Sequence, residues 1–213
     1  MIFDIHLVKD KKIEKFYASA IKEMNEFYKI NWNRNMPKVF LIPSRKEYDI
    51  FTDKKTEDWE VGSTIGGSYA VCMLNPEVYE KESCHKYSDK EYELLLKHEI
   101  SHLYTNILYK EYYPVWLLEG IAIYSSGELE LKEKVSKFEK FLEYFYQNDS
   151  GVYTEAGFAV KILDKEFGRD KLLTLLKALN GIKKEKDFKR IYTDIFGIEL
   201  EYEWFNERIN KYI

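Results

Sequence analysis

The chain has 213 residues, of which 45% are hydrophobic and 33% are charged, the balance of a globular protein that can bury one substantial core. Its net charge is −4 and its lysines are interleaved with acidic residues, which argues against a nucleic-acid-binding surface. No stretch approaches 18 apolar residues and no signal-peptide pattern opens the sequence, so we expect a cytoplasmic protein that does not enter a membrane.

The first helix and strand follow from the apolar pattern. Residues 11–32 place apolar side chains three and four positions apart, which predicts an amphipathic helix. Residues 38–42 form a short apolar run that ends at Pro43 and predict a buried strand. Ser44, with a glutamate three residues later, predicts an N-cap and a short helix to about Phe51.

Glycines and β-branched residues mark a hairpin in the next segment. Residues 60–75 predict two strands that meet at Gly66 and Gly67, and the second strand covers residues 68–74. We expect residues 76–88 to form a polar connection on the surface, before the next helix begins.

That next helix contains the sequence His98-Glu99-Ile100-Ser101-His102, an HExxH motif with apolar flanks. Residues four apart lie about 40° from each other around a helix and one turn apart along it, so both imidazoles can bind a single Zn²⁺. Glu99 follows the first histidine directly, which places its carboxylate beside the ion as a candidate general base. The alternative is a buried helix whose histidines bind hydrogen-bond partners and no metal.

A catalytic zinc site usually takes three protein ligands, so the motif needs one more. A third histidine in the metzincin pattern is excluded, because the required glycine and histidine positions hold Thr105 and Leu108. Glu119 lies in the following predicted helix, and the chain between is long enough to turn and bring its carboxylate to the metal. Gly120 would let the two helices approach closely. A cysteine and a histidine at 84–85 are an alternative source of the ligand.

The second half of the chain predicts helices alone. Pro114 precedes a helix over residues 115–125, which Gly127 ends. Residues 128–147 place apolar side chains at helical spacing and predict a long amphipathic helix. Four more helices are expected, at residues 154–167, 170–179, 185–196 and 200–212.

These elements predict an α+β protein with a single compact domain over residues 1–213. Its sheet-containing N-terminal part covers about residues 1–110, and its mostly helical C-terminal part covers about residues 111–213. No repeat, low-complexity tract or linker divides the series.

A second motif lies in the helix after the HExxH motif. Its residues, in order, are Pro114, Trp116, Leu117, Glu119, Gly120, Ala122 and Tyr124. Together the two motifs resemble the gluzincin metallopeptidases, and most closely the compact peptidase MA-like families; weaker similarity extends over residues 153–172. The resemblance implies a zincin-like fold, in which a small N-terminal mixed sheet packs on the HExxH helix.

The resemblance also implies roles for individual residues. His98, His102 and Glu119 would bind one Zn²⁺ per chain, and Glu99 would act as general base and proton shuttle. Tyr153 is the candidate for stabilising the oxyanion, with packing in the core as its alternative.

The remaining candidates concern the surroundings of the ion. Asn106 shares the helix face of the two histidines and is the candidate for orienting a ligand imidazole, with an ordinary polar residue near a helix end as the alternative. A substrate would lie extended along the second hairpin strand, with Gly67, Ser68, Tyr69 and Ala70 as its contacts.

The sequence therefore predicts a zinc-dependent peptidase that acts on peptide or protein substrates. One alternative is a catalytically weak zinc-binding gluzincin fold that acts as a protein-interaction module, although an intact Glu99 argues against it. A deformylase would need glycine-rich and cysteine-containing segments that the chain lacks. The substrate, the preference for internal or terminal bonds and the oligomeric state are left open.

Overall fold

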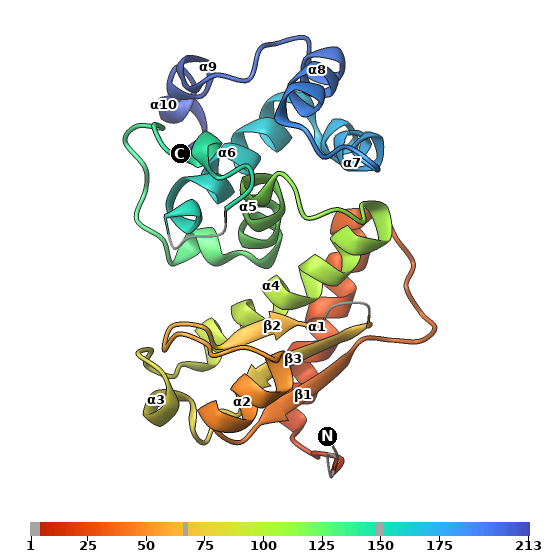
Figure 1. The fold of residues 1–213 in the computed structure, drawn as a ribbon, viewed down its shortest axis with the longest axis vertical. Coiled ribbons are helices and arrows are strands. Elements are labelled where there is room, and N and C mark those ends of the chain that lie inside the picture. The colour runs from red at the N-terminus through yellow and green to blue at the C-terminus, as the bar shows by residue number, and fades with distance from the viewer. Residues whose placement is uncertain (1–4, 66–67, 148–150) are drawn as a thin grey trace.

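The computed structural model describes residues 5–65, 68–147 and 151–213 (Figure 1). The fold is α+β, with a small mixed sheet in the N-terminal part and helices throughout the C-terminal part. This coarse prediction is confirmed. Among the described residues, no helix has the length and apolar content needed to cross a membrane.

The sheet has three strands in the order β1 (Lys38–Ile42), β3 (Ala70–Leu74) and β2 (Gly62–Thr64). The central strand β3 runs parallel to β1 and antiparallel to β2, and all five of its residues are buried. The predicted hairpin is confirmed, while its turn at 66–67 lies outside the described residues. Helix α2 (Arg45–Thr52) lies in front of the sheet in Figure 1, and the Ser44 side chain caps it as expected.

Two long helices pack behind the sheet (Figure 1). Helix α1 (Lys11–Tyr28) begins at Asp10, whose carboxylate accepts two backbone N–H groups of the first turn. Helix α4 (Asp89–Leu108) contains the HExxH motif and packs against α1 on one side and β2 and β3 on the other. The segment before α4, predicted as a plain connection, includes the short helix α3 (Tyr79–Glu82).

Helices α5 (Val115–Ser126) and α6 (Val152–Phe167) pack against each other at two glycines. A Cβ on Gly120 would lie 2.5 Å from the backbone oxygen of Ala156. A Cβ on Gly157 would lie 2.5 Å from a side-chain carbon of α5. Gly120 therefore permits close packing of α5 on α6, and not of α5 on α4 as the sequence led us to expect.

The segment 128–147 is not the long helix that its apolar spacing predicts. It contains only two short 3-10 turns, η1 (Glu128–Glu130) and η2 (Phe141–Glu143). The backbone N–H groups of residues 139–141 donate to the Glu155 carboxylate over 3.0–3.2 Å. Because a side chain of α6 takes these three donors, they are satisfied without the hydrogen bonds of a continuous α-helix.

The expected apolar side chains of this segment still point inward. Fully or nearly buried are Val135, Phe138, Phe141 and Phe145. Asn206 binds both the N–H and the carbonyl of Phe138, which fixes the segment to the C-terminal end of the chain. The burial prediction is correct and the secondary-structure prediction is wrong, because burial does not require a helix.

The remaining helices follow the predicted order. They are α7 (Arg169–Ala178), α8 (Glu185–Phe196), α9 (Tyr202–Asn206) and α10 (Ile209–Tyr212). The last predicted helix is thus two short ones. A continuous cluster of buried apolar side chains extends from α1 through the sheet and α4 to α9.

Candidate metal centre

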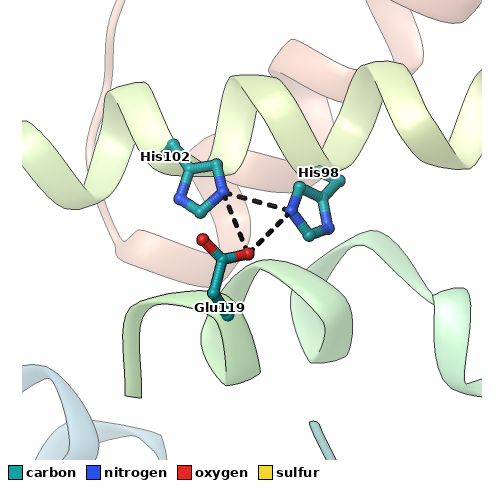
Figure 2. Close-up of side chains that lie close together, drawn as sticks. All are labelled: His98, His102 and Glu119. Atoms are coloured by element: carbon teal, nitrogen blue, oxygen red, sulfur yellow. Dashed lines mark hydrogen bonds and ion pairs between the residues drawn. The ribbon is translucent and has the colours of Figure 1, made fainter. Parts of the chain in front are cut away.

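Helix α4 presents three of the predicted site residues to one side of the molecule. Ser88 caps the helix by accepting a backbone N–H of its first turn at 3.1 Å, and the helix then runs for 20 residues without a break. His98 and His102 project from the same face, toward α5 (Figure 2). Glu99 is 7% exposed and His98 is 6% exposed, so both side chains are largely shielded from solvent, while His102 is half-buried.

Helix α5 runs past this face and contributes Glu119, whose carboxylate points at both imidazoles (Figure 2). The Nε2 atoms of His98 and His102 lie 3.1 Å apart. Glu119 Oε2 lies 3.3 Å from His98 Nε2 and 3.6 Å from His102 Nε2. The structure therefore brings together the three residues that the sequence nominated as ligands.

The spacing of these atoms matches a small tetrahedral ion. An ion with ligand bonds of about 2.0–2.1 Å holds neighbouring ligand atoms about 3.3–3.4 Å apart in tetrahedral geometry. The three separations in the structure, 3.1, 3.3 and 3.6 Å, bracket that value. Two imidazole nitrogens and one carboxylate oxygen form a donor set that suits zinc and other divalent transition metals.

The chemistry of Glu119 also fits a cation. Its Oε2 atom is buried and has no hydrogen-bond partner among the described residues, a costly state for a carboxylate oxygen. Burial alone would raise the pKa of this carboxyl, but the adjacent His102 and His98 hold the pKa below its usual range. The carboxylate therefore points at the Nε2 atoms of both histidines, and the three atoms lie close enough together to hold one metal ion.

Glu128 is a residue of this site that sequence reasoning missed. Its Oε1 lies 2.8 Å from His98 Nδ1, although the contact lacks the alignment of a hydrogen bond. Helix α5 ends at Gly127 with φ +88°, and this left-handed turn directs the next residue back toward α4. Burial lowers the pKa of His98, but the charges of Glu128 and Glu119 outweigh burial and raise that pKa well above its ordinary value.

Glu99 lies beside the ligand group and against the sheet. A Cβ on Gly62 would lie 3.0 Å from both the Cγ and the Oε1 of Glu99, so a larger residue here would press on this side chain. Burial raises the pKa of Glu99, and the nearby imidazoles of His98 and His102 oppose the shift. Among the described residues, none forms a hydrogen bond or ion pair with Glu99.

A cleft of 670 Å³ opens over the group and is lined by residues of β2, α4, α5 and η1. Tyr153, at the start of α6, lines this cleft with its ring centre 6.4 Å from that of His98 and 6.2 Å from that of Trp59. Asn106 also lines the cleft but is exposed, and no described contact joins it to either imidazole. Glu128, and not Asn106, contacts the ring of a ligand histidine. The contacts of the described residues therefore do not support Asn106 as the residue that orients a ligand imidazole.

The residues expected to contact a substrate do not line this cleft. Ala70 is buried in the central strand, whose backbone is already paired on both sides. Ser68 and Tyr69 are exposed outside the cleft, and Gly67 lies outside the described residues. The prediction treated β3 as an edge strand with one side free to pair with a substrate. In the structure β1 pairs with that side, so β3 is the central strand.

The free edge beside the cleft is β2. The Leu74 N–H of β3 donates to the Val61 carbonyl at 3.0 Å, and the Ile65 N–H donates to the Ala70 carbonyl at 2.9 Å. Pairing alternates along an antiparallel strand, so the backbone groups of Gly62 and Thr64 point away from β3. Both residues line the cleft.

The alternative ligands, Cys84 and His85, are not part of the ligand group. His85 Nε2 lies 3.0 Å from the backbone oxygen of Trp59, and Cys84 is exposed. Neither belongs to the group that could hold a metal. This alternative is therefore wrong.

A scan of the chain against known protein families and a search of curated proteins found no match. The assignment of the site depends on its geometry: His98, His102 and Glu119 form a largely buried group that can hold a metal ion.

Proposed function

We propose that the chain is a zinc-dependent peptidase of the gluzincin type, with a zincin-like fold. The observation that carries the proposal is the convergence of His98, His102 and Glu119 beside a buried carboxylate, Glu99, that has no structural partner among the described residues. A buried carboxylate without such a partner costs stability, so its presence next to a metal group favours a chemical role.

The residues of the site divide the chemistry between them. A Zn²⁺ ion held by His98, His102 and Glu119 would supply a Lewis acid that lowers the pKa of a bound water to about 7 and polarises a carbonyl. Glu99 takes the proton of the attacking water and passes it to the leaving amine. The raised pKa of Glu99 brings its carboxyl closer to neutral pH, where a proton shuttle is most effective. Tyr153 is the candidate donor to the oxyanion, because its side chain lines the cleft near His98.

The edge strand β2 offers a place for the substrate backbone. Gly62 and Thr64 direct backbone groups into the cleft, so an extended peptide can add to the sheet as a fourth strand. Gly62 also lies against Glu99, which would bring a peptide bound at this edge close to the general base. This replaces the substrate strand that the sequence suggested.

The experiment is metal analysis combined with cleavage of a peptide library. Wild-type protein should bind about one zinc per chain and cleave peptides, while His98→Ala should lose both properties. Glu99→Gln should keep zinc and fold but lose turnover by about 10² or more. A Glu99→Gln protein that cleaves at the wild-type rate would rule out the mechanism. Zinc binding without cleavage in any library would favour the interaction module.

A further inference from the structure

A chain of hydroxyl groups crosses three helices next to the metal group. Tyr28 Oη, on α1, lies 2.6 Å from Ser101 Oγ and 2.8 Å from Thr105 Oγ1, both on α4. Ser101 Oγ lies 2.8 Å from Ser125 Oγ, on α5. Tyr28, Ser101 and Thr105 are almost completely buried, so these hydroxyls depend on one another for hydrogen bonds.

The position of Ser101 makes this chain relevant to the ligands. Ser101 lies three residues after His98 and directly before His102, and it is the only HExxH residue with described hydrogen bonds to both α1 and α5. Ser125 lies on the same helix as Glu119. The hydroxyl chain thus connects the helix that carries two ligands to the helix that carries the third.

Apolar contacts are not directional, so a hydrogen bond between two helices adds a sharper constraint on their relative position than packing supplies alone. Hydrogen bonds of 2.6–2.8 Å are directional and lose strength within a few tenths of an ångström. Metal affinity depends on ligand atoms held at similar precision.

We propose that Tyr28 is a positioning residue for the metal centre, acting through Ser101 and Ser125 to set the relative position of α4 and α5. The inference rests on the metal-binding part of the proposed function and is independent of peptidase activity. It assigns a role to the small residue inside the HExxH motif and to an aromatic residue 73 positions earlier in the chain.

The test is titration of the full-length protein with Zn²⁺ and Co²⁺ after metal removal. Tyr28→Phe removes one hydroxyl and keeps the ring. It should weaken metal affinity by about 10-fold or more, the scale for losing a residue that orients a ligand, and should alter the visible absorption of bound Co²⁺. Ser125→Ala breaks only the link to α5, at a half-buried position, and should produce the same spectral change.

Tyr192→Phe is the matched control. Tyr192 is completely buried in α8, and its hydroxyl has no hydrogen-bond partner among the described residues. This variant should keep wild-type affinity and Co²⁺ absorption. If Tyr28→Phe and Ser125→Ala lower the melting temperature but leave both metal readouts unchanged, the chain only stabilises the fold and the inference is wrong. A wild-type protein that binds neither ion would instead refute the metal centre itself.

Discussion

Replacing Gly120 by alanine tests how tightly the packing of α5 on α6 controls the metal centre. The new Cβ would lie 2.5 Å from Ala156 O and 2.8 Å from Val160 Cγ2. Relief of the first contact to an ordinary separation of about 3.5 Å requires α5 to move by about 1 Å. Glu119 is the adjacent residue, so the movement should disturb the 3.3 and 3.6 Å separations that define the ligand group.

The expected magnitude combines two opposing effects. Overpacking of a core typically costs about 1–3 kcal/mol, while alanine gains about 1 kcal/mol over glycine inside a helix. We therefore expect Gly120→Ala to reduce the free energy of unfolding by up to about 2 kcal/mol. Zinc affinity should fall by about 10-fold or more, because a ligand is displaced by a large fraction of a bond length.

The assays are denaturant unfolding of the metal-free protein and zinc titration of the folded protein. Adding Val160→Ala to Gly120→Ala removes the side-chain contact but leaves the backbone oxygen of Ala156 in place. The double variant should therefore recover neither stability nor affinity. Full recovery, or a Gly120→Ala protein with wild-type zinc affinity, would refute the reasoning.

Three further changes have defined outcomes. Glu128→Gln removes the charge that faces His98 Nδ1, and zinc titration should show affinity reduced by about 10-fold to 100-fold with unfolding little changed. Glu155→Gln replaces the carboxylate that accepts three consecutive backbone N–H groups by an amide. Denaturant unfolding should therefore show a free energy of unfolding lower by about 2–3 kcal/mol. Burial raises the pKa of Asp164, but its ion pair with Arg169 outweighs burial and lowers that pKa. The resulting stability is complete above the unfolded pKa of about 3.9 and is lost as pH falls through the lower folded pKa, so Asp164→Asn should remove this acid dependence from melting curves.

The local parts of the site were predictable from the sequence. The spacing of His98 and His102 places both on one face once the helix forms. The same periodicity places the Glu99 side chain beside that face. Glu119 required the further assumption that the next helix returns across α4, which the structure supports. Glu128 carried no such signal, because its approach to His98 depends on the turn after α5.

The errors have a common physical origin in contacts between distant segments. Apolar spacing predicted a helix over residues 128–147, but Glu155 takes the backbone N–H groups of residues 139–141 in the middle of that segment. The hairpin was recognised from local pattern, yet the sheet edge was misplaced. Pairing of β1 with β3, across 27 intervening residues from Ile42 to Ala70, decides which strand is central.

The ligand group has a consequence for the way the whole chain holds together. Helix α4 belongs with the sheet and α1, whereas α5 packs on α6 in the helical half (Figure 1). An ion bound by His98, His102 and Glu119 would act as a cross-link between these halves. By mass action it would add about 2.7 kcal/mol to stability at a free concentration 100 times the dissociation constant. Metal supply would then govern the stability of the folded chain, and a chelator would loosen the junction between α4 and α5.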